Sequence, residues 1–210
     1  MNIVPQKHEI LLPPGTSLSA YLIQQARQIE AAARVCYKSE GNATDASYEK
    51  MVRMLRDKDH SAMLEFGVLA VKFTTNRGVT HELVRHRIPS YAQESTRYCN
   101  YAKDKFNNEL TFVRPPTWAD MTPEQHGCWK RAMEFAERSY LEGIALGLAP
   151  QLARGMLPND VKTEINVQCN FREWLHIFKL RMSPAAHPDI RLLLEPLKSE
   201  LAEALPCVFG

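Results

Sequence analysis

The spacing of apolar residues changes period several times along this chain, and this change constrains the fold more than any other feature. Between about 18 and 35, apolar residues recur every three or four positions, which predicts an amphipathic helix. From 66 to 74 they tend towards alternation, which predicts a strand. The elements do not follow a regular strand–helix–strand repeat. We therefore expect an α+β fold with an antiparallel β-sheet flanked by helices.

The other elements are expected from similar signals. Further helices are predicted at 47–56, 81–87, 122–146, 171–180 and 188–205, further strands at 110–113 and 161–168, and one or two helical turns at 150–157. Thr80 is the expected cap of the third helix, and Pro89 should end it. Thr122 followed by Pro123 is typical of a helix start. The polar stretch 90–98 is expected to be an ordered loop.

Composition limits the classes of function. A chain of 210 residues with 45% hydrophobic residues can bury one core, and no linker, repeat or low-complexity tract interrupts it, so we expect a single domain over 1–210. A net charge of +2 is too balanced to predict binding to nucleic acid or membranes, so any anion site must be local. No segment resembles a signal peptide or membrane helix, which favours a soluble, cytoplasmic protein.

The five cysteines are widely spaced and never form a Cys-x-x-Cys pair. This argues against a disulfide framework and against a zinc site, so we expect no metal. Cys99 lies two residues beyond Arg97, where a nearby cation can lower a thiol pKa, but an inert packing role is the commoner fate of a free cysteine.

Cationic residues gather at Arg85-His86-Arg87, and Arg97 follows after a polar stretch. If the triplet is helical, neighbouring side chains point about 100° apart, so the two arginines should serve two ligands or two parts of one. Arginine suits phosphates and planar, carbonyl-rich edges, which favours nucleotides. A bare triplet of this kind is more often solvated surface charge.

The residues after the triplet supply a longer motif. Arg85-His86-Arg87, then seven residues, then Ser95 resembles the signature of the flavin-dependent thymidylate synthases, and Ser90, Arg97 and Tyr98 fit its extended form. The resemblance continues in order through 31–37, 60–65, 170–172 and 180–181. It therefore covers most of the chain.

This resemblance implies an enzyme that methylates dUMP to dTMP. The family uses FAD as cofactor, 5,10-methylenetetrahydrofolate as one-carbon donor and NADPH as reductant, and it needs no cysteine nucleophile. Its members are homotetramers whose active sites are built from several subunits. A single domain of 210 residues could hardly enclose all these ligands alone, which agrees with a shared site.

The resemblance also implies which residues bind each ligand. FAD contacts are expected at His60, Ala62, Arg85, His86, Arg87, Gln93, Asn170, Phe171, Arg172 and His176. Contacts with dUMP are expected at Glu82, Leu83, Val84, Arg85, Gln93, Glu94, Ser95, Thr96, Arg97, Arg154 and Arg181. Within that set, 93–97 matches the phosphate cradle. Arg181 is the expected catalytic residue, because a fixed cation at the uracil edge favours ionisation at N3.

Some residues have simpler explanations when the resemblance is set aside. His176 is typical of a hydrogen-bonded core histidine, Arg154 of a solvated helix residue, and Arg181 of a cation near a helix C-terminus. The competing class is a non-enzymatic nucleotide or nucleic-acid binding module. It would use Arg77, Arg85, Arg87 and Arg97 for phosphates and Tyr91 and Tyr98 for stacking.

The chain departs from the family pattern at Ala62, Met63, Phe66 and Ala92, where many relatives carry Ser or Thr, Pro, His and Asn. Alanine at 62 removes a hydroxyl contact with FAD, so FAD affinity is expected to be lower. Glu82 stands at a usual polar nucleotide contact, but an ionised carboxylate cannot donate a hydrogen bond. Its partner must therefore be a sugar hydroxyl, water or Arg85.

Overall fold

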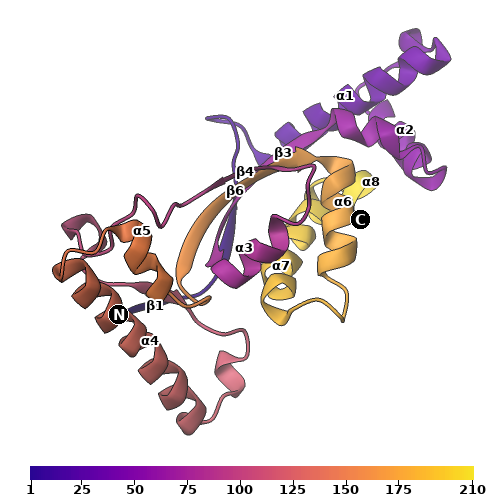
Figure 1. Cartoon of the computed structure of the whole chain (residues 1–210). Helices are drawn as coiled ribbons and strands as arrows, with labels where there is room; N and C mark the ends of the chain where they lie inside the picture. Colours follow the sequence, from indigo (N-terminus) through magenta and orange to yellow (C-terminus); the bar gives the residue numbers. More distant parts are fainter. The chain divides into compact units, whose positions relative to one another are not determined.

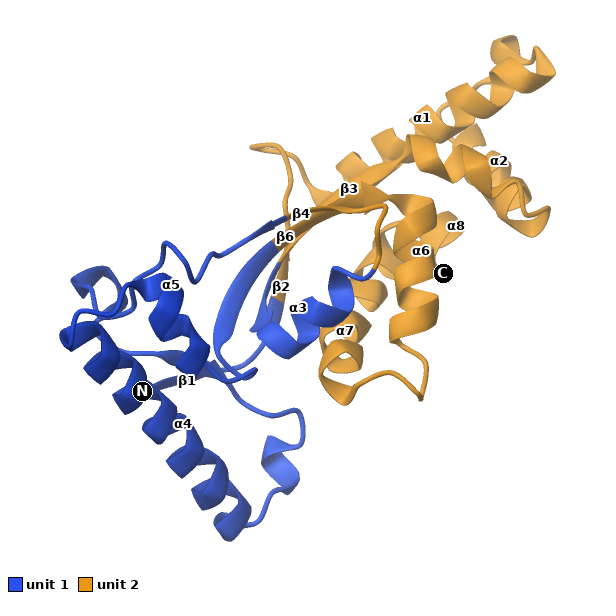
Figure 2. Cartoon of the chain, viewed as in Figure 1, with its two compact units in different colours: residues 1–7, 73–85, 92–165 blue, residues 8–72, 86–91, 166–210 orange.

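The structure, a computed structural model, describes residues 1–210, which divide into two compact units (Figure 2). Unit 1 consists of residues 1–7, 73–85 and 92–165, and unit 2 consists of residues 8–72, 86–91 and 166–210. Neither unit is one continuous stretch of chain. The expected single domain over 1–210 stays a prediction.

The helices and strands alternate irregularly along the chain (Figure 1). The helices are α1 (Leu18–Tyr37), α2 (Ser47–Asp57), α3 (Arg77–Leu83), α4 (Pro123–Ala145), α5 (Pro150–Ala153), α6 (Phe171–Arg181), α7 (Pro188–Ala204) and α8 (Pro206–Phe209). The strands are β1 (Asn2–Val4), β2 (Lys7–Ile10), β3 (Val68–Asn76), β4 (Ser90–Gln93), β5 (Thr111–Val113) and β6 (Lys162–Asn170). Short 3₁₀ helices lie at Glu40–Asn42, Ser61–Phe66, Asp104–Phe106, Trp118–Asp120 and Arg154–Met156.

The strands form two sheets. Four of them follow the order β2-β3-β6-β4, and β1 pairs in parallel with β5, with Asn2 opposite Thr111. The expected α+β fold with an antiparallel sheet and flanking helices is confirmed. The parallel pair β1–β5 was not predicted. No helix combines the length and apolarity needed to cross a membrane.

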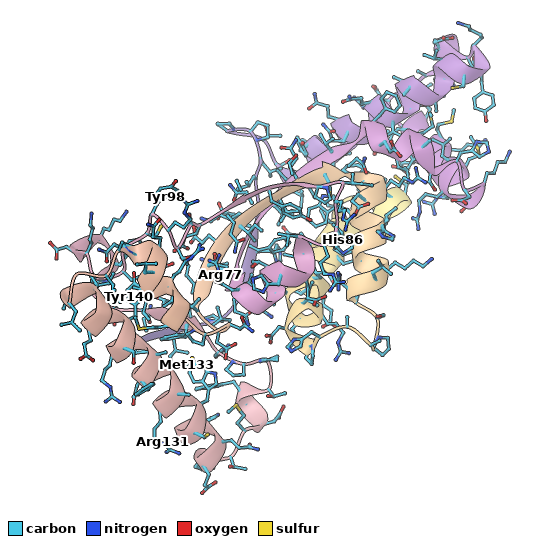
Figure 3. All side chains as sticks on the ribbon, viewed as in Figure 1. Arg77, His86, Tyr98, Arg131, Met133 and Tyr140 are labelled. Carbon is cyan, nitrogen blue, oxygen red and sulfur yellow. The ribbon has the colours of Figure 1, made fainter.

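Unit 1 is built around helix α4 and strand β5. Met133 and Tyr140 of α4 are buried with Phe112 of β5, and Figure 3 labels the two helix residues. The helix begins where the sequence predicts, because Thr122 accepts the N–H of Gln125 and the Gln125 side chain accepts the N–H of Thr122. This core anchors the loop that follows β4.

In unit 2, α1, α2 and α6 pack against the 3₁₀ helix Ser61–Phe66 that precedes β3, and α1 and α2 run side by side (Figure 1). Trp174 of α6 is fully buried, and its indole N–H donates to the carbonyl of Leu69 over 3.1 Å. A Cβ at Gly67 would lie 2.8 Å from both Ile29 and the Phe171 ring, so only glycine allows this approach. These contacts fix α6, which carries several predicted site residues.

The prediction for the third helix was wrong at both ends. The helix starts at Arg77 because the Asn76 side chain accepts the N–H of Val79 over 2.8 Å, and Thr80 lies inside it, with its hydroxyl donating to Arg77 O. It ends at Leu83, well before Pro89. The triplet 85–87 therefore follows the helix, and the argument from helical spacing does not apply to it.

Two further boundaries needed correction. The expected loop 90–98 begins with strand β4, which pairs with β6. Phe66 ends a 3₁₀ helix instead of starting a strand, because the Gly67 N–H donates back to Leu64 O and closes a helical turn. Strands β1 and β2, helix α8 and the 3₁₀ helices outside 150–157 were not predicted.

Candidate functional site

Unit 2 contains a polar cluster of His86, Glu173, His176 and Arg181, here called the His86 cluster; Figure 3 labels His86. The ring atom Nδ1 of His86 lies 3.2 Å from Glu173 Oε1, and Nε2 lies 3.0 Å from Nε of Arg181. The His176 ring stands edge-on to His86, with centroids 5.6 Å apart. All members except His86 come from α6.

Burial controls the charge of His86, whose side chain is 4% exposed. Burial lowers the pKa of His86 and the Arg181 cation lowers it further, while Glu173 acts in the opposite direction. The net shift is downward, so the ring is neutral at neutral pH. The Tyr91 hydroxyl donates to the His86 carbonyl over 2.8 Å, and burial raises the pKa of Tyr91.

The first turn of α6 holds the predicted residues Asn170, Phe171 and Arg172. Asn170 caps the helix by accepting the N–H of Glu173 over 2.8 Å. The Phe171 ring is buried, and the main-chain N–H of Phe171 donates to the Gly67 carbonyl over 2.9 Å. Arg172 is exposed and donates to Glu65 over 2.6 Å. Of the three, only Arg172 presents a charged side chain to solvent.

The predicted residues His60 and Ala62 line a largely apolar pocket in unit 2. Its volume is about 230 Å³, and its other walls are Ala33, Cys36, Tyr37, Leu55 and Met63. His60 and Ala62 are exposed. A pocket with these walls suits an apolar or aromatic group with few polar contacts.

Unit 1 contains a second polar cluster of Glu94, Tyr101, Lys162 and Glu164, here called the Glu94 cluster. The carboxylate of Glu94 accepts from the Tyr101 hydroxyl over 2.8 Å, from the Lys162 ammonium over 3.0 Å and from the Glu164 N–H over 3.3 Å. Burial and the Glu94 charge raise the pKa of Tyr101. Protein donors therefore engage both oxygens of Glu94.

The loop after Glu94 is a compact turn. Ser95 Oγ accepts the N–H of Arg97, and the Ser95 carbonyl accepts the N–H groups of Tyr98 and Cys99. The main-chain N–H groups of Ser95 and Thr96 have no acceptor within the protein. The Arg97 side chain is exposed, and its guanidinium lies 5.5 Å from the centre of the Tyr98 ring. These donors suit an anion such as a phosphate.

The side chain of Gln93, the residue before Glu94, is held by two threonine hydroxyls. Its Nε2 donates to the hydroxyls of Thr80 and Thr163 over 3.0 and 3.2 Å. Among the remaining predicted nucleotide contacts, Leu83 is fully buried, Glu82 is half-buried, and Val84, Arg85 and Arg154 are exposed. Leu83 can therefore reach a ligand only through its main chain.

The two units divide the predicted residues by ligand. Unit 1 carries every predicted dUMP residue except Arg181, and unit 2 carries every predicted FAD residue except Arg85 and Gln93. The sequence missed Glu173 and the partners of Glu94, and it named Tyr91 only as a stacking residue of the competing binding module. The signal for Glu173 was present, because Asn170-x-x-Glu173 is the spacing of a helix cap with a carboxylate in the first turn.

A metal centre is the other chemistry that the His86 cluster suggests. Ligand atoms of His86, Glu173 and His176 lie within 4.8 Å of one another. However, both ring nitrogens of His86 already have polar neighbours, and one of these is the Arg181 cation at 3.0 Å. A metal ion bound there would have to displace that cation. The geometry favours a hydrogen-bonded cluster.

Comparison with known proteins shows the family. A family model described as "Thymidylate synthase complementing protein" matches residues 17–207. The flavin-dependent thymidylate synthase of Mycobacteroides abscessus is 30% identical, over 97% of this chain and 86% of that protein. The chain belongs to the flavin-dependent thymidylate synthase family. It is therefore related to enzymes over nearly its whole length.

Other relatives agree with this assignment. The flavin-dependent thymidylate synthase of Pyrococcus furiosus is 36% identical, over 74% of this chain and 63% of that protein. Among solved structures, a UMP/dUMP methylase, PolB from Streptomyces cacaoi bound with 5-Br dUMP, has a TM-score of 0.76 at 20% identity. That alignment covers 100% of this chain and 95% of PolB. The family and PolB share this fold.

Proposed function

We propose that the protein catalyses FAD-dependent methylation of dUMP to dTMP, with 5,10-methylenetetrahydrofolate as one-carbon donor and NADPH as reductant. The other products are tetrahydrofolate and NADP⁺. The observation that carries this proposal is the half-buried Arg181, held at the His86 ring in a chain of this family. A guanidinium fixed in this way can stabilise negative charge that develops on a uracil ring.

The residues of unit 2 fit a flavin dinucleotide in their chemistry. The exposed guanidinium groups of Arg87 and Arg172 suit a diphosphate, and the apolar pocket beside His60 and Ala62 suits an aromatic ring. When bound, FAD supplies the hydride that completes the methyl group and recovers its electrons from NADPH. Asn170 and Phe171 contribute by fixing the start of α6.

We propose that dUMP binds through the loop of unit 1. The unpaired N–H groups of Ser95 and Thr96, the Ser95 hydroxyl and the Arg97 guanidinium would hold the phosphate. The exposed Arg85 and Arg154 carry further positive charge for the same nucleotide, as the family resemblance implies. Glu82, Leu83, Val84, Gln93 and Glu94 would contact or shape this site.

Arg181 is the residue that we propose touches the reacting ring. Its cation would favour loss of the proton at N3 of uracil, which increases electron density at C5, where the new carbon is attached. A partly buried position strengthens this effect, because water screens the charge less there. The cysteines are not needed for this chemistry.

The cysteines support that conclusion. All five are free, and burial raises the pKa of the Cys169 and Cys207 thiols, which disfavours thiolate formation. Cys99, the nearest to the phosphate loop, is half-buried and packs against the core of unit 1. We therefore propose a reaction without a cysteine nucleophile and without a metal, in a cytoplasmic protein.

We also propose a homotetramer with shared active sites. Unit 1 exposes several large apolar side chains, among them Phe135 at 65%, Leu146 at 79% and Leu152 at 64%. Large contiguous apolar patches are typical of surfaces that bind other protein chains, and a tetramer interface over these side chains would cover them. Light scattering of the purified protein should give four times the mass of the 24.0 kDa chain.

The activity is tested with purified protein loaded with FAD. We expect the protein to oxidise NADPH and to release tritium from C5-labelled dUMP when methylenetetrahydrofolate is present, with dTMP as product. Absence of both reactions would contradict the proposal. Colourless protein that instead shifts RNA, and binds it less tightly as salt rises, would support the nucleic-acid binding module.

A further inference from the structure

Glu173, His86 and Arg181 form a continuous chain of contacts within unit 2. A guanidinium has donors and no acceptor, so His86 Nε2 must offer its lone pair to Arg181 Nε at 3.0 Å. The proton of a neutral ring then lies on Nδ1 and points at Glu173 Oε1, 3.2 Å away. One protonation pattern satisfies both contacts: ionised Glu173, neutral His86 protonated on Nδ1, and cationic Arg181.

The other possible pattern fails at Arg181. If Nε2 carried the proton, two donors would face each other across 3.0 Å, and Glu173 would face a lone pair instead of a proton. A doubly protonated ring would place a second cation against the Arg181 guanidinium. Glu173 therefore selects the tautomer of His86 that can hold Arg181.

Burial and the helix make this selection firm. The side chains of His86 and Glu173 are 4% and 7% exposed, so water competes little for either contact. Glu173 sits in the first turn of α6, where its N–H donates to Asn170 and the helix dipole favours a negative charge. The ionisable groups that face His86 or its partners are Tyr91, Cys169, Glu173, His176 and Arg181.

The hydrogen bond from Arg181 to His86 uses the Nε atom of the guanidinium. His86 meets Nε, so neither of the two Nη amino groups takes part in this hydrogen bond. The Nη groups form the planar pair that binds carbonyl-rich edges. Holding Nε restricts the rotation of the guanidinium plane, which is what an oriented cation requires.

We propose that Glu173 is a positioning residue that acts through His86 to orient Arg181 towards the uracil ring. This inference rests on the proposed function. It also gives His86 a role that the sequence did not predict, because both ring nitrogens are engaged within the protein. Any contact between His86 and a flavin is then left to the carbon edges and face of the ring.

Two substitutions at Glu173 test the proposal in the FAD-loaded protein. Glu173→Met keeps the volume and removes the acceptor, so kcat for tritium release should fall on the order of 10- to 100-fold, a typical loss when a supporting hydrogen bond is removed. Glu173→Gln keeps an oxygen that can accept from Nδ1 and should restore most of the rate. The KM for NADPH and the visible flavin absorption should stay unchanged in both variants.

Two controls separate this effect from a general loss of structure. Lys179→Met removes an exposed charge from the same helix and should leave kcat and Tm as in the wild type. In Glu173→Met, the acidic limb of the kcat profile should also move, because Glu173 no longer acts on the His86 pKa. A structural defect would lower the amount of active protein without moving that limb.

Imidazole ¹⁵N NMR of the wild-type protein tests the tautomer independently of catalysis, with His86 assigned by comparison with His86→Gln. We expect a neutral ring protonated on Nδ1 in the wild type. Protonation on Nε2, or a Glu173→Met variant with wild-type kcat and pH profile, would overturn the positioning role. Protein with the expected tautomer that releases no tritium and oxidises no NADPH would contradict the proposed function instead.

Discussion

Glu94 in unit 1 and Glu173 in unit 2 are both carboxylates held among polar groups, and they differ in what they contact. Glu94 in unit 1 is bound by Tyr101, Lys162 and the main chain, so its contacts end within the fold. Glu173 in unit 2 contacts a titratable ring that passes the contact on to Arg181. Burial of a carboxylate therefore does not reveal its role. The role follows from the last residue that its contacts reach, which is Arg181 in the case of Glu173.

The largest expected effect is at Arg181, the last residue in the series of contacts Glu173–His86–Arg181 in unit 2. Arg181→Ala should reduce tritium release from dUMP by about 10²- to 10³-fold, the range seen when one charge-stabilising donor is removed. Flavin absorption should be retained. Lys179→Ala, an exposed cation on the same helix, is the matched control. Loss of flavin with unchanged dUMP binding would contradict the assignment of Arg181.

A substitution in the phosphate-binding loop of unit 1 should change the KM for dUMP and leave kcat nearly unchanged. Arg97→Ala should raise the KM for dUMP about 10- to 100-fold with little change in kcat, because a hydrogen bond to a charged group contributes about 1.5–3 kcal/mol. Steady-state kinetics at two salt concentrations measure this, since exposed charges are screened. Arg138→Ala, exposed on α4, is the control. A fall in kcat as large as that of Arg181→Ala would show that Arg97, like Arg181, acts on the chemical step, and would contradict a role in binding alone.

Replacing the Glu94 carboxylate should lower stability and leave kcat intact, because we place Glu94 at the dUMP site and not at the reacting ring. In Glu94→Gln the Lys162 ammonium loses the nearer of its two anionic partners and keeps Glu164 at 3.5 Å, so the free energy of unfolding should fall by about 1–3 kcal/mol in urea titrations. Adding Lys162→Met should recover part of this loss, and the exposed Glu134→Gln should change nothing. A large loss of kcat per folded molecule would erase the contrast between Glu94 and Glu173.

Acid should weaken unit 2 through His86, whose pKa is lowered in the folded protein. Below the unfolded value of about 6.5, the unfolded chain gains a proton that folded His86 resists, so unfolding becomes easier as pH falls. The slope should be at most about 1.4 kcal/mol per pH unit. Urea titrations of wild type and His86→Gln isolate this contribution, since the other histidines are common to both. Parallel pH dependences would contradict it.

The elements with local signals were predictable from the sequence. Helix α4 starts at Pro123 because Thr122 and Gln125 cap it, and these residues are only three positions apart in sequence. Helix α3 was misplaced because two polar residues, Asn76 and Thr80, both suit a cap, and only the folded backbone shows that Asn76 is used. Strand β1 was missed because its partner β5 lies far along the chain.

The ligands assigned to the site residues stay a prediction. The family resemblance supplied the residues of both proposed ligand sites, through the motif from Arg85 to Ser95 and through further matching segments along the chain. It did not supply the contact between His86 and Glu173, which joins residues 87 positions apart. No local pattern shows which carboxylate a buried histidine will meet, since tertiary packing decides it.

The interleaving of the two units limits how the gene can be divided. The chain passes between units five times, at 7/8, 72/73, 85/86, 91/92 and 165/166, and one passage lies inside the Arg85-His86-Arg87 triplet. No single cut yields either unit as a whole polypeptide. A single recombination event therefore cannot exchange one unit and leave the other intact. If the chain is cut once and both fragments are co-expressed, at least one unit is divided between the two fragments.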